Sequence, residues 1–446
     1  MFLSGLPYDY LPQGHLRMKI AITTVGTRGD LQPYIALGLG LKDAGHEVLI
    51  VSSKNEQTFV ENYGLDFFAL NVDIQKLMDG DEVQEMSKGN NPIKFILSHL
   101  KGSKKLKQLM IETQAEIWTA CQTADIIIFH PGMPLGFFIA QKKKRISVMA
   151  NPFPVVATND YPAILFYTSP RLGKLWNKIT HKIFEKLFWS LSKSAIVEFW
   201  NSSVKTKMNF SVSPIRQQID SGMPVINGYS NLFFHQPNDW QNNIQTTGNW
   251  FIDKEPNFTP PTDLSKFIDK GEPPIYIGFG SMKDISSFKT TLNIIKEALD
   301  ITKQRAVVGL GWSKLSYNEN IPDNIFLIES IPHTWLFPKM KTVIHHGGAG
   351  TTATGLRAGK PTIIIPHNAD QPAWGKRVFE LGVGSKPIKK TNLTAANLAS
   401  AIQFAQQPNI ILNADKLGRE LRKENGVKNA VKIINDCITT DKNGSS

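Results

Sequence analysis

A glycine-rich segment in the last third of the chain has the residue types and spacing of a site for a diphosphate. Residues 342–375 read TVIHHGGAGTTATGLRAGKPTIIIPHNADQPAWG, and the glycines at 347, 348 and 350 let a backbone approach a ligand closely. A β-branched run precedes them and a helical stretch follows, so the turn directs unpaired N–H groups and the positive end of a helix dipole at one point. A G-G-x-G turn is not specific for a ligand, because many such turns only allow a helix to pack closely on a strand.

Two polar residues that follow the next apolar run favour a ligand site. Asp370 and Gln371 come after the predicted strand at 361–366, and the carboxyl ends of parallel strands lie at one edge of a sheet. A carboxylate and an amide beside phosphate-binding N–H groups suit a nucleotide sugar, with the two side chains bonding to sugar hydroxyls. The alternative is structural, because Asp370 precedes Pro372 and could simply be a helix-start residue.

The elements that would position this site alternate between short apolar runs and helical patterns. This alternation predicts an α/β protein with two Rossmann-like domains, each a doubly wound parallel sheet that begins with a strand and a glycine-rich turn. A ligand would then lie in the cleft between the domains, at the carboxyl ends of the strands. The predicted strands are 19–25, 46–52, 125–129 and 146–150, and then 274–279, 306–310, 325–328, 342–345 and 362–365.

Shifts in composition indicate where these domains begin and end. Residues 1–17 are interpreted as a leader, and Met18 is an alternative natural start because the first strand begins at Lys19. Residues 18–240 are predicted to form the N-terminal domain and residues 274–425 the C-terminal domain. The linker at 241–273 is rich in Asn, Gln, Thr and Pro. Residues 426–446 are predicted to be a helix and a disordered tail.

Composition excludes several classes of protein. With 446 residues, 41% of them hydrophobic and 20% charged, the chain is long enough for two domains with real cores and is not of a disordered type. No apolar run reaches the length that crosses a bilayer, and the first residues lack the pattern of a secretory signal. Cys121 and Cys437 make neither a disulfide framework nor a metal cluster, which favours a reducing, cytoplasmic setting.

The net charge of +12, with a pI near 9.4, calls for an anionic partner. No recognition helix, zinc finger or aromatic RNA-binding pattern is present, so nucleic acid is not expected. From Lys174 to Leu191, helical spacing places a stripe of apolar residues beside a row of lysines. This pattern is typical of a helix that anchors a protein peripherally on an anionic membrane surface. The other interpretation is a surface helix whose stripe packs on its own domain. The apolar stripe contains Leu175, Ile179, Ile183, Leu187 and Leu191, and the row of lysines contains Lys174, Lys178, Lys182 and Lys186.

Four segments carry a resemblance that spans nearly the whole chain. They are GTRGDLQPYIALGLGLKDAGHEV at 26–48, MPVINGYS at 223–230, YIGFGSM at 276–282 and IPHTWLFPKMKTVIHHGGAGTTATGLRAGKPTIIIPHNADQPAWGKRV at 331–378. In this order they resemble the GT-B glycosyltransferases of the UDP-glycosyltransferase superfamily, within them the UDP-glucose:sterol glucosyltransferase-like group. The resemblance implies a GT-B fold, with two Rossmann-like domains facing a cleft. It also implies inverting, metal-independent transfer of a hexose, expected to be glucose, from a UDP-sugar to a sterol or other lipid-like acceptor.

The resemblance further implies roles for individual residues. Asp30 would be the general base that takes the proton of the acceptor hydroxyl, and the acceptor would contact Phe153, Tyr161 and Trp374. His345 and the glycine turn would hold the diphosphate, and the segment around Ile331 and His333 would hold uracil. The UDP-sugar-binding residues would be Gly29, Ser281, Trp312, Ile331, His333, His345, Gly347, Gly348, Ala349, Gly350, Thr351, Asp370 and Gln371. No metal, and no cofactor besides the donor sugar nucleotide, is implied.

Several of these positions have ordinary alternatives. Asp30 lies just before Pro33 and could be a helix-start residue; a helix dipole there lowers the pKa of a carboxylate and weakens it as a base, while burial under a bound lipid raises it. His345 and His346 are adjacent at a strand, so they point to opposite faces and at most one meets the cleft. Arg28 either anchors the anion or pairs on the surface.

The acceptor is the least constrained part of the prediction. Its pocket is expected in the N-terminal domain, near residues 131–134 and 151–162 and the helix that begins near Lys174. The chain reads ANPFPVVATNDYPA where sterol-type members have a loop rich in Trp, Thr and Arg, and it has Ala373 where an aromatic is usual. A sterol, another polycyclic or lipid alcohol and a polyketide-type aglycone all remain open. So do a nucleotide-sugar epimerase and a nucleotide-sugar-binding protein without turnover.

Overall fold

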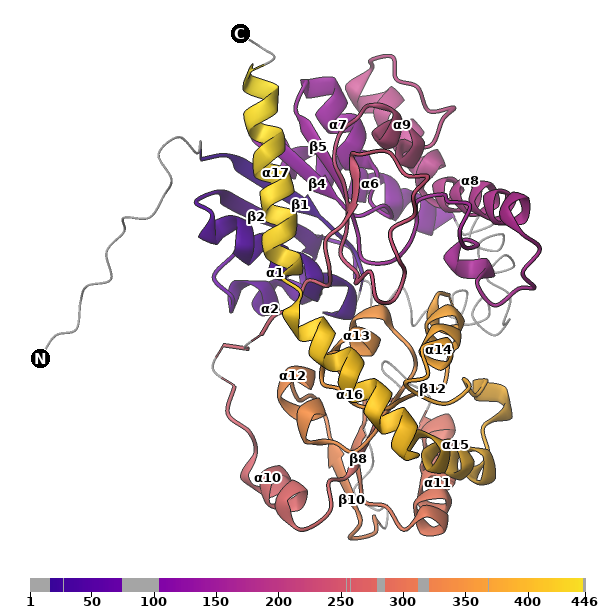
Figure 1. Ribbon diagram of the computed structural model, residues 1–446. Coiled ribbons are helices and arrows are strands. Elements are labelled where there is room, and N and C mark those ends of the chain that lie inside the picture. The colour runs from indigo at the N-terminus through magenta and orange to yellow at the C-terminus, as the bar shows by residue number, and fades with distance from the viewer. Residues whose placement is uncertain are drawn as a thin grey trace, which may run out of the picture.

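The computed structural model describes residues 17–26, 28–73, 104–253, 255–256, 258–278, 285–311, 321–367 and 369–443. These residues form two domains, one above the other in Figure 1, and each domain is built on a parallel β-sheet with helices on its faces. The predicted α/β class with two doubly wound parallel sheets is confirmed.

The N-terminal domain contains a seven-stranded sheet in the order β3-β2-β1-β4-β5-β6-β7. β1 pairs in parallel with β2 on one side and with β4 on the other, so the order of the strands reverses at β1. Ligands bind at such switch points, beyond the carboxyl ends of the strands. The strands are β1 (Lys19–Thr23), β2 (Glu47–Ser53), β3 (Asp66–Leu70), β4 (Ile126–Phe129), β5 (Ile146–Asn151), β6 (Val225–Asn227) and β7 (Ile244–Thr246).

The C-terminal domain contains a five-stranded sheet in the order β10-β9-β8-β11-β12. Its first strand along the chain, β8, pairs in parallel with β9 and β11, so this sheet has the same kind of switch point at its centre. The strands are β8 (Ile275–Gly278), β9 (Ala306–Gly309), β10 (Ile325–Ile328), β11 (Val343–His345) and β12 (Thr362–Ile364).

The helices cover both faces of the two sheets. In the N-terminal domain they are α1 (Arg28–Asp43), α2 (Gln57–Glu61), α6 (Lys104–Ala120), α7 (Leu135–Lys143), α8 (Lys174–Phe199) and α9 (Pro214–Asp220). After them come α10 (Thr262–Asp269), α11 (Ile285–Thr302), α12 (His333–Leu336), α13 (Ala349–Arg357), α14 (Gln371–Glu380), α15 (Ala395–Ala405), α16 (Pro408–Lys423) and α17 (Gly426–Asn443).

Coverage on both faces explains why the central strands are apolar without alternation. All four residues of β4, the sequence IIIF, are buried, and so are all four residues of β8. α1 packs its apolar side on the first sheet, and the hydroxyl of Tyr34 donates a 2.7 Å hydrogen bond to the carbonyl oxygen of Ala150 in β5. This bond fixes the start of α1 relative to the carboxyl ends of the neighbouring strands.

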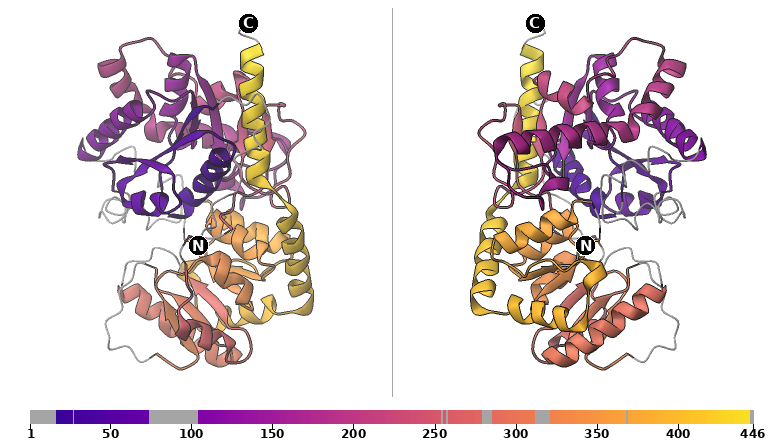
Figure 2. Two further views of the ribbon diagram at one scale, coloured as in Figure 1. Left: turned by 90° about the vertical axis from the view of Figure 1, so that its left-hand side faces the viewer. Right: turned by 90° about the vertical axis from the view of Figure 1, so that its right-hand side faces the viewer.

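The end of the chain returns to the N-terminal domain. α16 lies against α13, and α17 packs on α1, as the yellow helices in Figures 1 and 2 show. Ala430 and Ile434 of α17 belong to the same apolar core as the buried side chains of α1, and Gly40 of α1 leaves room for Val427. The domains are therefore joined both by the segment after β7 and by this crossing, which keeps their strand ends facing each other.

Candidate active site

The turn between β1 and α1 brings Asp30 to the carboxyl edge of the first sheet. Asp30 is the third residue of α1, and its exposed carboxylate lies against Gly26. A side chain on Gly26 would overlap that carboxylate, and its φ of +142° is one that only glycine adopts readily. The predicted site residue Gly29 lies across from the other domain, because a Cβ built on Gly350 would be 3.6 Å from the carbonyl oxygen of Gly29.

The glycine-rich turn of the C-terminal domain leads directly into a helix. Gly347 has a φ of +95°, and Gly348 is the N-cap of α13, so Ala349, Gly350 and Thr351 form its first turn. The first N–H groups of a helix have no acceptor within that helix, and no side chain caps α13. This end of α13 faces the turn that carries Gly29, so its N–H groups and its dipole are directed into the region between the domains.

Only one of the two adjacent histidines faces the site, as the strand geometry predicts, but it is not the predicted one. His345 is fully buried, and its Nδ1 accepts a 2.9 Å hydrogen bond from the N–H of Gly347. Burial, with smaller contributions from the neighbouring histidines, holds the pKa of His345 well below its usual value. His346 lines the cavity described next, and burial lowers its pKa to about 4. His346 therefore lines the cavity whereas His345 is packed in the core, and the phosphate contact predicted for His345 stays a prediction.

Gly348 makes the position of His346 possible. A Cβ on Gly348 would lie 2.8 Å from Nε2 of His346, which is too close for an ordinary contact. Gly347 is required in a different way, because a Cβ there would lie 2.6 Å from Cγ2 of Ile364 in β12. The two glycines thus have separate functions: one packs the turn on the sheet, and the other leaves room for the imidazole ring.

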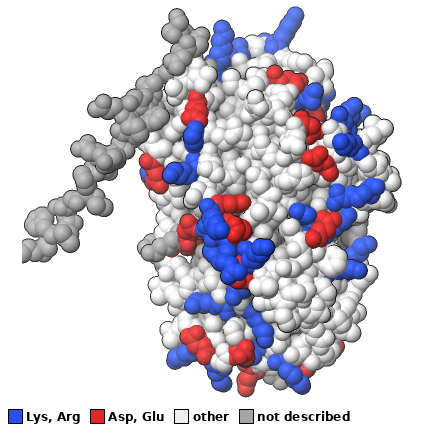
Figure 3. Space-filling model, in the orientation of Figure 1, with Lys and Arg blue, Asp and Glu red and all other residues white. Residues whose placement is uncertain are grey.

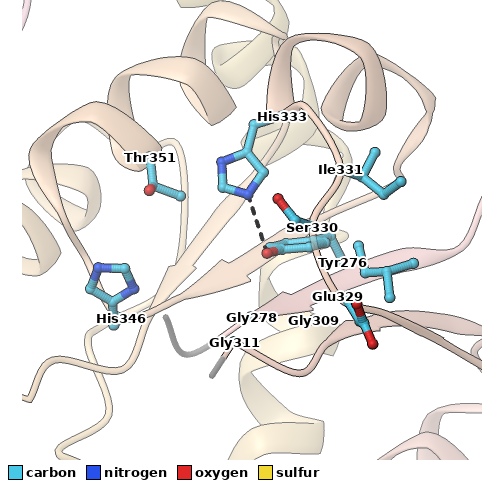
Figure 4. A pocket seen from close by; sticks show the side chains of 11 residues that line it. Tyr276, Gly278, Gly309, Gly311, Glu329, Ser330, Ile331, His333, His346 and Thr351 are labelled. Carbon is cyan, nitrogen blue, oxygen red and sulfur yellow. Dashed lines mark hydrogen bonds between the residues drawn. The ribbon is translucent and has the colours of Figure 1, made fainter. Parts of the chain in front are cut away.

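A cavity of about 150 Å³ opens at the carboxyl ends of β8, β9 and β10, beside the start of α13 (Figure 4). Ile331, His333 and Thr351, which the sequence predicts in the donor site, all lie in its wall. The hydroxyl of Tyr276 lies 3.3 Å from Nε2 of His333, and the His333 ring stacks on Phe337 at 4.3 Å between centroids. The wall is formed by Tyr276, Gly278, Gly309, Gly311, Ile328, Glu329, Ser330, Ile331, His333, His346 and Thr351.

Several residues of this wall are absent from the sequence-based list. Gly278 and Gly309 end neighbouring strands in register, and a side chain on Gly278 would overlap the ring of Tyr276. Glu329 and Ser330 directly follow β10. The signal that could have found them is their place at the ends of predicted parallel strands, where ligand-binding residues gather. Burial lowers the pKa of His333 to about 4, so this ring is neutral at neutral pH and has an acceptor nitrogen.

Asp370 and Gln371 lie at the start of α14, on the same edge of the sheet. Asp370 is the N-cap residue, but its carboxylate does not cap the backbone; Oδ2 accepts a 2.7 Å hydrogen bond from the indole N–H of Trp374. Burial, and to a smaller extent the charge of Asp30, raise the pKa of Asp370 to about 6. Oε1 of Gln371 accepts a 2.8 Å bond from the N–H of His367. The helix-start alternative thus describes the position of Asp370 but not what its carboxylate does.

The three residues predicted to contact the acceptor occupy different environments. Phe153 follows β5, is half-buried, and lies with its edge near His130, which follows β4. Tyr161 is almost fully buried and packs among His181, Phe234 and His235. Trp374 is only 1% exposed and lies edge-on to Phe233 and Phe234, and its indole N–H bonds to Asp370; its predicted contact with the acceptor stays a prediction.

Arg28 connects the two domains beside the cavity. Its guanidinium lies 4.1 Å from the centroid of the Phe59 ring, pairs with the carboxylate of Glu255, and donates a 3.4 Å hydrogen bond from Nη1 to Oγ of Ser330. Because Ser330 belongs to the cavity wall, Arg28 lies at the edge of the proposed donor site as well as in an ion pair.

Some predicted positions lie outside the described residues. These are Ser281, Trp312, almost all of the leader and the last three residues of the tail. Within the described ranges, no group of three or more His, Cys, Asp or Glu side chains has the arrangement of a metal site. A search of the helices in the same ranges finds none with the length and hydropathy of a membrane span.

Two family models match the chain, one in each half. Residues 20–162 match the glycosyltransferase family 28 N-terminal domain, and residues 295–436 match the C-terminal domain of erythromycin biosynthesis protein CIII-like proteins. The fold is also similar to solved structures. The kitacinnamycin glycotransferase has a TM-score of 0.65 at 16% identity, with 94% of this chain and 98% of that one covered. The spinosyn forosaminyltransferase SpnP has a TM-score of 0.65 at 14% identity, with 95% and 100% covered. The chain therefore has the GT-B fold of these glycosyltransferases.

The sequence comparison identifies the family within this class. A sterol 3-beta-glucosyltransferase of Arabidopsis thaliana is 33% identical over 436 residues, which cover 93% of this chain and 67% of the plant protein. A second Arabidopsis sterol 3-beta-glucosyltransferase is 32% identical, with 97% and 67% covered. The protein belongs to the sterol 3-beta-glucosyltransferase family. A fungal member from Sclerotinia sclerotiorum is 34% identical, and the chain spans 29% of its length.

Proposed function

We propose that the protein transfers glucose from UDP-glucose to the hydroxyl of a sterol, with inversion at the anomeric carbon. The observation that carries this proposal is the convergence of Asp30, the first turn of α13 and Asp370 at the facing edges of the two sheets. The names of the relatives support the sterol and the glucose. Another lipid alcohol or a polyketide-type aglycone is the alternative acceptor, because the loop at 150–163 differs from the sterol-type pattern.

The donor would bind along the C-terminal domain. The N–H groups at the start of α13 and the imidazole of His346 would hold the diphosphate, where backbone donors and a helix dipole stabilise negative charge without reorganising. Uracil would lie near Ile331 and His333, in the cavity wall that the ring of Tyr276 supports. Asp370 and Gln371, at the start of α14, would bond to hydroxyls of the sugar.

Asp30 would act as the general base. It would take the proton of the acceptor hydroxyl while the acceptor oxygen forms a bond to the anomeric carbon from the face opposite UDP. The bond from the anomeric carbon to the diphosphate oxygen breaks in the same step, and UDP leaves with the electron pair. Charge on the leaving group is met by the N–H groups of α13, so metal independence is part of the proposal; activity in the presence of EDTA tests it.

The test is an assay with radiolabelled UDP-glucose and a panel of sterols. The wild-type protein is expected to form labelled, organic-soluble glucoside only when an acceptor is present, and Asp30→Asn is expected to lose that product while still binding UDP. The anomeric coupling constant of the glucoside reports inversion. Tight binding of UDP without turnover would replace the proposal with a binding protein, and conversion of the donor sugar without acceptor would replace it with an epimerase.

A further inference from the structure

The first half of α8 exposes most of its apolar stripe and, apart from Phe184, buries polar side chains. Three side chains on its inward face are polar and buried: Asn177, Thr180 and His181. Leu175 and Ile179, on the outward face, are 73% and 39% exposed. A helix of a soluble domain normally buries its apolar side and exposes its polar side. The interpretation that this stripe packs on its own domain is therefore wrong for the first half of α8.

Specific hydrogen bonds hold this orientation. Nδ2 of Asn177 donates a 2.7 Å bond to the carbonyl oxygen of Asn159, and Oγ1 of Thr180 accepts a 3.0 Å bond from the N–H of Ala163. Nε2 of His181 lies 3.0 Å from the carbonyl oxygen of Tyr161. These bonds satisfy polar backbone groups of the loop before α8, so turning the helix to bury its leucines would break all three. The exposed stripe follows from the way the helix is anchored.

The exposed face combines apolar and basic side chains. Four of the exposed large apolar residues in the described part of the chain lie here together: Leu172, Leu175, Ile179 and Ile183. Lys174, Lys178, Lys182 and Lys186 lie along the same turns, and none of them has an acidic partner among the residues that the structure describes. The one carboxylate on these turns, Glu185, accepts a hydrogen bond from Ser213. We call this face, from Leu172 to Lys186, the α8 surface.

The α8 surface lies on the outside of the N-terminal domain. Figure 2 shows α8 lying across the outside of the domain in the right-hand view, and Figure 3 shows blue side chains gathered at the edge where α8 lies in Figure 1. A helix that exposes leucine and isoleucine flanked by lysines matches the depth profile of a bilayer with anionic headgroups. A protein partner would need an apolar groove surrounded by acidic groups. An anionic bilayer has a charged headgroup layer above an apolar layer over its whole surface.

We propose that the α8 surface docks on an anionic phospholipid bilayer. The leucine and isoleucine side chains enter the boundary between headgroups and acyl chains, and the lysines contact lipid phosphates and carboxylates. The docking is independent of the sugar donor. If the proposed function holds, the docking also places the loop that carries Tyr161, which α8 anchors, next to the membrane in which a lipid acceptor dissolves.

The experiment is co-sedimentation of the purified full chain with phosphatidylcholine vesicles, with and without phosphatidylserine. The wild-type protein is expected to sediment with the anionic vesicles and to be released by high salt. Lys178→Glu with Lys182→Glu is expected to weaken binding by about tenfold or more, because each basic residue near an anionic surface contributes to affinity. Leu175→Ser with Ile179→Ser is expected to weaken binding to a similar degree. All four side chains are exposed, so the fold is expected to survive, and circular dichroism checks it.

Matched controls lie on other helices. Ile411 and Leu412 of α16 are 40% and 62% exposed, so Ile411→Ser with Leu412→Ser removes similar apolar exposure elsewhere. Lys416→Glu with Lys428→Glu makes the same change in net charge. Both controls are expected to bind vesicles as the wild type does. The proposal is overturned if the α8 variants also bind unchanged, or if the wild type ignores the vesicles. It is equally overturned if the wild type is a dimer that Leu175→Ser with Ile179→Ser dissociates, because a second copy would then cover the stripe.

Discussion

The indole N–H of Trp374 donates a 2.7 Å hydrogen bond to Oδ2 of Asp370, one turn earlier in the same helix. The indole lies edge-on to Phe233 and Phe234, which belong to the N-terminal domain, so the carboxylate proposed to bind sugar is held by a side chain that is packed between the domains. This relationship connects the geometry of the donor site to the contact between the domains.

Trp374→Phe tests that connection, because it removes the donor and keeps most of the ring. The hydrogen bond lowers the pKa of Asp370, so its loss is expected to raise that pKa above about 6. If the sugar is bound by the ionised carboxylate, the acid limb of kcat/KM for UDP-glucose moves to higher pH. The expected cost in unfolding free energy is about 1 kcal/mol. An unchanged pH profile would mean that Trp374 only fills space.

Asp370→Asn is expected to raise stability while lowering activity. The folded-state pKa of about 6 lies above the usual carboxyl value of 3.8, so protonation favours the folded state. That contribution is complete below the unfolded pKa and is lost as pH rises through about 6. At neutral pH the Asn variant, which can still accept from Trp374, is therefore expected to gain about 1 to 3 kcal/mol. Thermal unfolding as a function of pH measures this, and a gain that does not shrink towards acid pH would contradict the electrostatic cause.

Alanine variants distinguish the roles of His345 and His346. His346→Ala is expected to raise the KM for UDP-glucose by about 10- to 100-fold with little loss of stability, because a hydrogen bond to a charged group is lost. His345→Ala is expected to lower the free energy of unfolding by about 2 to 4 kcal/mol, because it leaves a cavity in the core. Donor titrations and thermal unfolding of both variants distinguish the roles. The reverse pattern would support the phosphate contact predicted for His345 instead.

Gly348→Ala tests whether the glycine serves the histidine. The new methyl group would lie 2.8 Å from Nε2 of His346 and displace the ring, so donor affinity is expected to fall with little change in thermal stability. Gly355→Ala in the middle of α13 is the control, because its Cβ would have no neighbour closer than 3.4 Å. That substitution is expected to stabilise by about 0.5 to 1 kcal/mol, since alanine favours a helix interior. Equal donor affinity in the two variants would remove the proposed function of Gly348.

The sequence predicted the elements better than it predicted which way side chains point. The parallel strands and the glycine turns carry a local signal, because their apolar runs stop at glycine. The predicted bounds of these strands agree with the observed ones to within a few residues. The choice between His345 and His346 depends on where β11 ends and the turn begins, and adjacent residues differ only in which face they meet. No local pattern decides that point.

Two other positions were decided by tertiary contacts. The position of Trp374 shortly after Asp370 suggests an aromatic residue that contacts a ligand. The two phenylalanines that pack against it come from the other domain. The stripe of α8 fits either burial or exposure by its spacing alone. The polar bonds of Asn177, Thr180 and His181 to the preceding loop decide between them, and a helical pattern does not reveal those partners.

The central claim is that a UDP-sugar is held by its diphosphate at the start of α13, and a crystal soaked with UDP tests it most directly. We expect the diphosphate beside the N–H groups of Ala349, Gly350 and Thr351, within hydrogen-bonding distance of His346, and uracil near Ile331 and His333. UDP bound at another place, or a calorimetric titration without measurable heat at any concentration, would contradict the account.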